Sequence, residues 1–186
     1  LSLNFHVSPA LTQGEKATGS PFDGQTCSAC HSGGSYTTTV TLQLLHNGSP
    51  VTTYNIGGTY VLRLTRTATG TAKPFGFQMT CCKSTSPYAN VNAWGTSLPI
   101  NTGNHVSSSH NYIEQTNYIY NTINQLDFPW IGPASGTGNV TFYISLNTVD
   151  SNSSTSGDKE SSTSLTITAS GLPVTWLYFN GTNNNN

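Results

Sequence analysis

Charged side chains are scarce in this chain, and their scarcity excludes several classes of partner. Lys, Arg, Asp and Glu together make up 7% of the 186 residues, and the net charge is −1. A typical globular domain carries about 25% charged residues. Without a basic patch, the chain has nothing to attract the phosphates of a nucleic acid or an anionic membrane surface. The composition therefore predicts no nucleic-acid partner.

Long hydrophobic runs and targeting features are missing as well. No stretch approaches the roughly 20 apolar residues that a membrane-spanning helix requires. The opening LSLNFHVSPA has no basic residues of the kind that begin a signal peptide, and the chain starts with Leu, so we expect a processed mature form. We therefore expect no membrane span. Because Ser, Thr, Asn and Gly rather than charged residues make the chain polar, we expect an extracellular or cell-surface location.

Motifs for hydrolytic catalysis are also absent from the sequence. There is no G-x-S-x-G turn that would expose a nucleophilic serine. The seven acidic residues are too dispersed to nominate a pair of catalytic carboxylates. We therefore expect a protein that is not an enzyme.

Alternating hydrophobic residues are present along most of the chain, and they predict strands. No amphipathic helix of normal length is found, and turn-forming residues separate the alternating runs. About seven short strands at regular spacing predict an all-β fold, an immunoglobulin-like antiparallel β-sandwich. The clearest runs lie at 37–45, 59–66, 74–82, 138–147 and 164–169.

The same pattern divides the chain into three parts. Residues 1–36 have no sustained period and form an N-terminal arm. Residues 37–170 form the β-sandwich. It includes a long middle segment at 83–137 that is rich in Ser, Asn and Tyr, for which we expect mainly loop with one short strand at 111–120. Residues 171–186 form a C-terminal extension.

Two of the four cysteines and one of the five histidines are concentrated in GQTCSACHSGG at 24–34. This segment contains Cys27, Cys30 and His31 in a C-x-x-C-H pattern, which is typical of covalent c-type haem attachment. The two thiols add to the two vinyl groups of one porphyrin, and the histidine becomes an axial ligand of the iron. The pattern therefore predicts one covalent haem c per chain.

Three other interpretations of the pattern stay open. A local disulfide between Cys27 and Cys30 suits an oxidising compartment. A redox dithiol is less favoured because such a pair normally lies at a helix start beside a βαβ unit. Half of a zinc site is least favoured because no second pair of ligands follows at the usual spacing.

The sixth position of the iron has several candidate ligands. His110 is our first choice, and His105 is the second, because both lie in the long middle segment that could fold over a cofactor. Met79 alternates with aromatic residues, so core packing is favoured over iron ligation. His6 lies in the N-terminal arm and could reach only a neighbouring subunit or a nearby loop. Two imidazoles would suit electron transfer, because they give a six-coordinate iron that rearranges little.

Two further groups of residues have less specific patterns. Cys81 and Cys82 point to opposite faces if they lie in a strand, so a vicinal disulfide, a bridge to another chain or a bridge to the C-x-x-C pair all stay open. Asp150, Asn152 and Asp158, with Ser154, resemble a calcium loop. That loop lacks the Glu at its required last position, so a solvated loop is favoured.

Four segments together resemble a known family. They are TGSPFDGQTCSACHSGG, GFQMT, GTGNVTFYISLN and STSGD, and they are similar to segments of the reeler-like bacterial "choice-of-anchor V" domain family over residues 18–170. The resemblance implies an exported surface protein with a reeler-like β-sandwich. LPVTWLYFNG also resembles the segment that follows such domains in proteins of the type IX secretion system. One departure is Gln115, which stands where the family tends to have a histidine.

Two functional hypotheses follow. The first is an extracellular monohaem c-type cytochrome-like protein that transfers electrons, as the repeating subunit of a surface filament. The second is a structural surface or adhesion protein in which Cys27 and Cys30 form a disulfide and no haem is bound. Low charge and the apolar termini LSLNFHV and LPVTWLYF favour a homo-oligomer or filament built through terminal strands. The redox partner is not predicted by any feature of the sequence.

Overall fold

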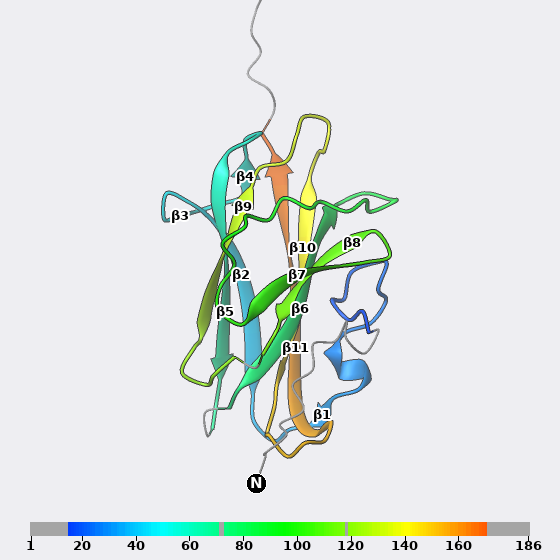
Figure 1. Ribbon diagram of the computed structural model, residues 1–186, viewed down its shortest axis with the longest axis vertical. Coiled ribbons are helices and arrows are strands. Elements are labelled where there is room, and N and C mark those ends of the chain that lie inside the picture. Colours follow the sequence, from blue (N-terminus) through cyan, green and yellow to red (C-terminus); the bar gives the residue numbers. More distant parts are fainter. Residues whose placement is uncertain (1–14, 71–72, 118, 171–186) are drawn as a thin grey trace, which may run out of the picture.

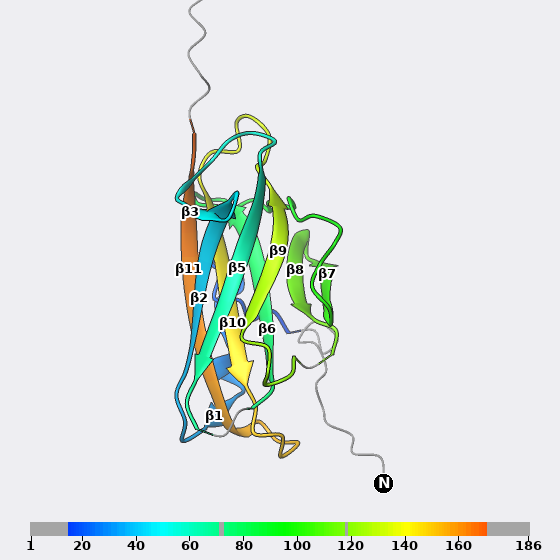
Figure 2. The same cartoon turned by 90° about the vertical axis from the view of Figure 1, so that its left-hand side faces the viewer.

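The computed structural model describes residues 15–70, 73–117 and 119–170, which fold into two packed β-sheets (Figure 1 and Figure 2). The larger sheet contains, in spatial order, β1 (Ser32–Gly33), β11 (Ser156–Ala169), β10 (Val140–Thr148), β6 (Phe75–Lys83), β8 (His110–Gln115) and β7 (Thr102–Ser107), and β4 (Thr53–Tyr54) also pairs with β11. The smaller sheet contains β3 (Ser49–Val51), β2 (Thr38–His46), β5 (Thr59–Ala68) and β9 (Gln125–Ile131). The predicted all-β sandwich is confirmed.

The core lies between the two sheets and follows the alternation in the sequence. In β5, Tyr60, Leu62 and Leu64 are buried, while Arg63 on the opposite face pairs with Asp127 of β9 through two bonds of 2.8 and 2.7 Å. Aromatic rings then fill the centre of the sandwich, because large side chains bury the most area and interlock edge to face. The central rings are Tyr54, Tyr60, Trp94, Phe128, Trp130 and Phe142.

The middle segment contains more regular structure than its composition predicts. β7, β8 and β9 all lie between residues 83 and 137, where we expected mainly loop with one short strand. β9 is obscured in the sequence by Pro129, which normally argues against a strand. The carbonyl of Pro129 faces Gly95 rather than β5, so the missing N–H lies on the edge side and removes no bond to β5.

The N-terminal segment, residues 15–31, lies against the outer face of the larger sheet. The Ala17 N–H donates to Gln78 of β6 at 2.7 Å, and the Tyr112 hydroxyl of β8 donates to Asp23 at 2.7 Å. The Cys27 N–H donates to Ser145 of β10 at 2.9 Å. This cover explains why β6 and β10 are buried on both faces, and it fixes the C-x-x-C-H segment on the sheet.

Candidate functional site

The C-x-x-C-H segment forms one tight turn on the outer face of β10 and β11. Thr26 caps η2 (Cys27–Ala29), and the N–H groups of Cys30 and His31 both donate to the carbonyl of Cys27, at 3.2 and 3.0 Å. The turn leaves Cys27 half-buried and Cys30 exposed, and both are free thiols. Two free thiols and an imidazole are therefore presented from one rigid piece of backbone.

His31 is held by a buried carboxylate. Its Nδ1 lies 2.7 Å from Oδ2 of Asp158, the third residue of β11, whose side chain is 1% exposed. The same carboxylate accepts from the Asp150 N–H at 3.0 Å and from the Asn147 amide at 3.3 Å. Because Nδ1 is hydrogen-bonded to Asp158, Nε2 is the ring nitrogen that could bind a metal ion. The His31 side chain is 32% exposed.

Backbone pairing explains why His31 meets Asp158. β1 pairs with the start of β11, and the Gly34 N–H donates to the Asp158 carbonyl at 2.8 Å. A Cβ atom on Gly34 would lie 2.8 Å from that carbonyl oxygen, so only glycine permits this approach. The HSGG and STSGD segments thus form one site, although His31 and Asp158 are 127 residues apart in the chain.

Asp158 has a role that its sequence pattern did not predict. The spacing of Asp150, Asn152, Ser154 and Asp158 suggested a calcium loop, but Asp158 is committed to His31 and to two amide donors. The other three close a series of short turns by bonding one another's backbone. Within the described residues, no group of three or more His, Cys, Asp or Glu side chains is arranged to hold a metal ion.

The environment of Cys27 differs from that of Cys30. Burial, with a smaller contribution from the nearby Glu160 carboxylate, raises the pKa of the Cys27 thiol to about 11. Ser145 connects the two, because it accepts from the Cys27 N–H and donates to Glu160 at 3.1 Å. Cys27 is therefore protonated at neutral pH, and a protonated thiol is a poor nucleophile for disulfide formation.

This difference predicts selective labelling of reduced, haem-free protein. The rate of Cys27 alkylation, measured by peptide mass spectrometry, should rise about tenfold per pH unit up to about pH 11. The reason is that only the thiolate reacts, and its fraction rises tenfold per pH unit below the pKa. In urea-unfolded protein the Cys27 thiol should return to its ordinary pKa of 9.0. The alkylation rate should then level off about two pH units lower than in the folded protein. Equal labelling rates for Cys27 and the exposed Cys30 at neutral pH would contradict this packing.

Of the candidate sixth ligands, His6 lies outside the described residues, and neither His110 nor His105 lies beside His31 in the same chain. His110 is on β8, which β6 and β10 separate from β11, and strand register displaces it roughly 25 Å along the sheet from Asp158. The His110 ring stacks on Phe22, with centroids 3.8 Å apart. His105 lies 3.9 Å from the buried Glu114.

Met79 and the cysteine pair occupy buried positions in β6. Met79 is fully buried in the core, as its alternation predicts. Cys81 also faces the core, whereas Cys82 faces outward beneath the N-terminal segment, near Asp23. Both thiols are 0% exposed and free, and burial raises the pKa of each. The opposite-face prediction is confirmed, and neither thiol is accessible to another chain in this fold.

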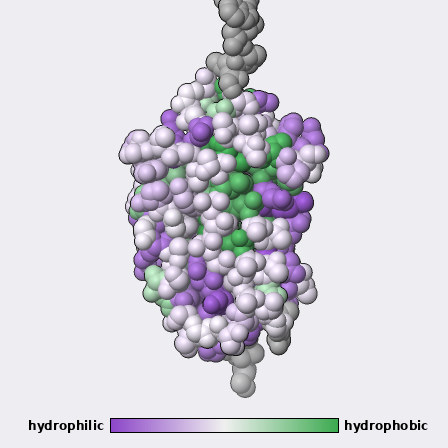
Figure 3. All heavy atoms as spheres, turned by 180° about the vertical axis from the view of Figure 1, so that it is seen from behind, coloured by the Kyte–Doolittle hydropathy of each residue, from purple (hydrophilic) through white to green (hydrophobic). Residues whose placement is uncertain are grey.

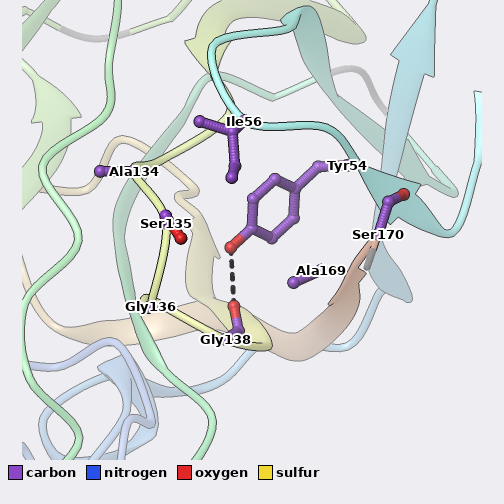
Figure 4. Close-up of a pocket in the computed structure, with 8 residues that line it drawn as sticks. All are labelled: Tyr54, Ile56, Ala134, Ser135, Gly136, Gly138, Ala169 and Ser170. Atoms are coloured by element: carbon purple, nitrogen blue, oxygen red, sulfur yellow. Dashed lines mark hydrogen bonds between the residues drawn. The ribbon is translucent and has the colours of Figure 1, made fainter. Parts of the chain in front are cut away.

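A separate pocket of about 260 Å³ lies beside β4, at the end of the sandwich away from β1 (Figure 1 and Figure 4). The Tyr54 hydroxyl crosses it and donates to the Gly138 carbonyl at 2.7 Å. Among the described residues, its wall contains Ile56, Ala134 and Ala169 and no carboxylate, imidazole or ammonium group. These residues offer mainly apolar contact.

Comparison with known proteins identifies the fold but no family. No family model matches the chain, and no curated protein matches it. Among solved structures, the Reelin-N domain of F-spondin is similar, with a TM-score of 0.50 and 16% identity over 78% of this chain and 96% of that domain. A human F-spondin reeler-domain fragment is 14% identical over 70% and 92%, with a TM-score of 0.47. The fold is reeler-like.

Sequence identities at this level establish the architecture alone, because one fold supports many functions. The reeler-like fold agrees with the part of the family resemblance that concerns the β-sandwich. In the described residues, no helix is long and apolar enough to cross a membrane.

Proposed function

We propose that this protein is an exported, monohaem c-type cytochrome-like protein that transfers electrons. Haem c would be attached to Cys27 and Cys30, and His31 would supply an axial nitrogen. The observation that carries the proposal is the hydrogen bond of 2.7 Å between His31 Nδ1 and Asp158, because it leaves Nε2 as the ring nitrogen that would bind the iron. Histidines that bind metals almost always donate the other ring N–H to a carboxylate, carbonyl or water.

The donor set fits a covalent haem. Both thiols are free, they belong to one capped turn, and Cys30 is exposed. The turn is tied to the sheet through Cys27 and through β1, so its backbone is rigid before any group is attached. A buried structural zinc site would need four ligands, and the described residues provide no such cluster.

Each residue of the site has a separate task in this proposal. Haem, when bound, supplies a one-electron couple whose potential depends on its axial ligand and surroundings. Cys27 and Cys30 fix the position of the group, and His31 binds the iron. Asp158 orients the imidazole, keeps the proton on Nδ1 and makes Nε2 a stronger electron donor. Export is supported by the low charge and the Ser, Thr and Asn content.

Absorption spectroscopy of the native protein tests this proposal. We expect a Soret band, sharp bands after dithionite reduction, and a chromophore that stays with the protein through acid–acetone extraction. The double variant Cys27→Ser/Cys30→Ser should lose the covalent chromophore completely. Ser28→Ala, in the same exposed turn, should retain it, which controls for disturbance of the backbone.

A featureless spectrum would overturn the haem proposal. Mass spectrometry without reductant would then show whether Cys27 and Cys30 form the local disulfide. That result would favour the alternative function, a structural or adhesion β-sandwich protein at the cell surface. Its supporting observation is the spacing of two thiols in one turn of a rigid, reeler-like domain.

A further inference from the structure

The pocket beside β4 lies where the described part of the chain ends. Its wall includes Ala169, the last residue of β11, and Ser170, the last described residue. The Ser170 N–H donates to the Tyr54 carbonyl of β4 at 2.8 Å, and the Ala169 N–H donates to the Asn139 side chain at 3.1 Å. The end of β11 is therefore fixed between β4 on one side and the start of β10 on the other.

The walls of the pocket continue from these two neighbours. On the β4 side is the turn at 55–58, which includes Ile56. On the β10 side is the loop at 132–139, which includes Ala134. Figure 4 shows these residues around one space, with Ser170 at its side. A segment that continues from Ser170 therefore starts in the pocket wall.

The surface of the pocket is mainly apolar. Ile56 is 43% exposed, and Ala134 is also exposed. Gly136 and Gly138 have φ angles of +80° and +75°, and no described atom lies within 4 Å of the position that a Cβ would take at either residue. Figure 3, which views the molecule from behind Figure 1, shows further hydrophobic residues gathered toward the end of the sandwich that contains the pocket. Apolar residues grouped in this way mark a contact site more than scattered ones do.

The size and chemistry of the pocket favour a peptide segment over a small molecule. Its volume of about 260 Å³ is below the roughly 300–1,000 Å³ of typical small-molecule sites. Such sites also place a few polar or charged groups that orient the ligand. Among the described residues, this wall has no carboxylate, imidazole or ammonium group, and the Tyr54 hydroxyl is already bonded to Gly138. The pocket therefore suits aliphatic side chains.

The sequence that follows Ser170 has the matching character. Residues 171–174 are GLPV, without a charged or hydrogen-bonding side chain. Gly171 is the only residue between Ser170 and Leu172, so a leucine lies two positions from the pocket wall. A connection this short gives an effective concentration of roughly millimolar or higher, which a segment of a second copy does not reach at ordinary protein concentrations. The chain's own segment is therefore the favoured occupant.

We propose that residues 172–174 of the same chain cover the pocket, with aliphatic side chains packed against Tyr54, Ile56 and Ala134. This contact closes the apolar end of the sandwich and fixes the point from which the rest of the C-terminal segment leaves. The pocket lies at the end of the sandwich away from β1 (Figure 1), so the contact does not depend on haem at His31. It and the proposed function can therefore fail separately.

NMR spectroscopy of the 186-residue chain tests the contact directly. We expect nuclear Overhauser contacts between the methyl groups of Leu172 or Val174 and the Tyr54 ring. The amide protons of residues 172 and 174 should exchange at least about tenfold more slowly than those of Leu177 and Tyr178, because the docked backbone is shielded from water. In a mixture of labelled and unlabelled chains, the contacts should stay within single chains.

Ile56→Lys tests the pocket side. It places a charge in the apolar wall, and the fold should be retained because the side chain is 43% exposed. The contacts with Tyr54 should be lost, and amide exchange at 172 and 174 should become about tenfold faster, matching 177 and 178. Ile100→Lys makes the same change at a side chain that is 75% exposed and lies near β7, so it should alter neither readout. Circular dichroism and visible spectra should be unchanged in both variants.

Leu172→Ser/Val174→Ser tests the segment side, with Leu177→Ser as its matched control. The double variant should lose the slow amide exchange at 172 and 174, and the control should retain it.

Several results would overturn the proposal. One is wild-type protein in which residues 172–174 exchange as fast as 177–178, and another is an Ile56→Lys variant that keeps the contacts. Contacts that form only between labelled and unlabelled chains would assign the pocket to a second copy. Contacts of the Tyr54 ring with a co-purified apolar molecule would assign it to a small ligand.

Discussion

Asp158→Ala is expected to destabilise the protein by about 3 kcal/mol, because three donors lose a buried acceptor. The donors are His31 Nδ1, the Asp150 N–H and the Asn147 amide, at 2.7, 3.0 and 3.3 Å. Bonds to a charged group contribute more than neutral ones, and an unpaired buried donor costs further free energy. Thermal unfolding measured in haem-free protein should show a fall in Tm of roughly 10 °C.

Asp158→Asn separates the structural role from the proposed positioning role. Asn has nearly the same shape but no negative charge, so the loss of stability should be smaller, about 1–2 kcal/mol. In the haem-loaded protein, redox titration should give a more positive midpoint potential, because a weaker donor to Fe(III) disfavours the oxidised state. An unchanged potential would show that Asp158 stabilises the turn without tuning the ligand.

Trp130→Ala is expected to cost about 3–5 kcal/mol, a large part of the total stability of a domain of this size. Trp130 of β9 is 1% exposed and lies edge to face with Phe142 at 5.3 Å and with Tyr54 at 5.5 Å. Its loss would leave a cavity that strands from both sheets line and that cannot collapse. Urea unfolding should show a lower midpoint with an unchanged slope.

Two control variants bracket this effect. Trp130→Phe keeps an aromatic ring in the core and removes an indole N–H that has no hydrogen-bond partner in the described structure, so the cost should stay below about 1.5 kcal/mol. Ile100→Ala, at a side chain that is 75% exposed, should change stability by less than about 0.5 kcal/mol. A Trp130→Ala variant as stable as Ile100→Ala would contradict the described core.

Much of the fold could be predicted from the sequence because burial on one face of a strand leaves a period of two. Leu62 and Leu64 of β5 and Met79 of β6 show it clearly, and each is fully buried. β9 was harder to predict because Pro129 breaks the expected composition, and only the edge position of its missing N–H makes it acceptable. The short strand expected at 111–120 overlaps β8, but its partner β7 was hidden by polar residues, because much of β7 faces solvent.

Only part of the candidate site could be predicted from the sequence. Cys27, Cys30 and His31 are adjacent in the chain, so their spacing alone predicts a shared chemistry. Asp158 carries no such mark, because its partner lies at the other end of the sequence. The preference for His110 as a ligand rested on proximity in a loop-like segment. Strand order places β10 and β6 between His110 and the strand of Asp158, and register displaces His110 roughly 25 Å along the strand direction. No local pattern reveals either one.

The sequence by itself determined the low charge, which is a property of composition. It also determined most strand-forming segments and the C-x-x-C-H turn, because each of these depends on residues close together in the chain. The tertiary structure alone decided which long-range partners meet. Pairing of β1 with β11 brings Asp158 to His31, and β2 packs beside β11, where the Val40 N–H donates to the Ser161 side chain at 3.1 Å. These outcomes depend on strand order and register, which backbone hydrogen bonds fix between segments that carry no local signal of each other.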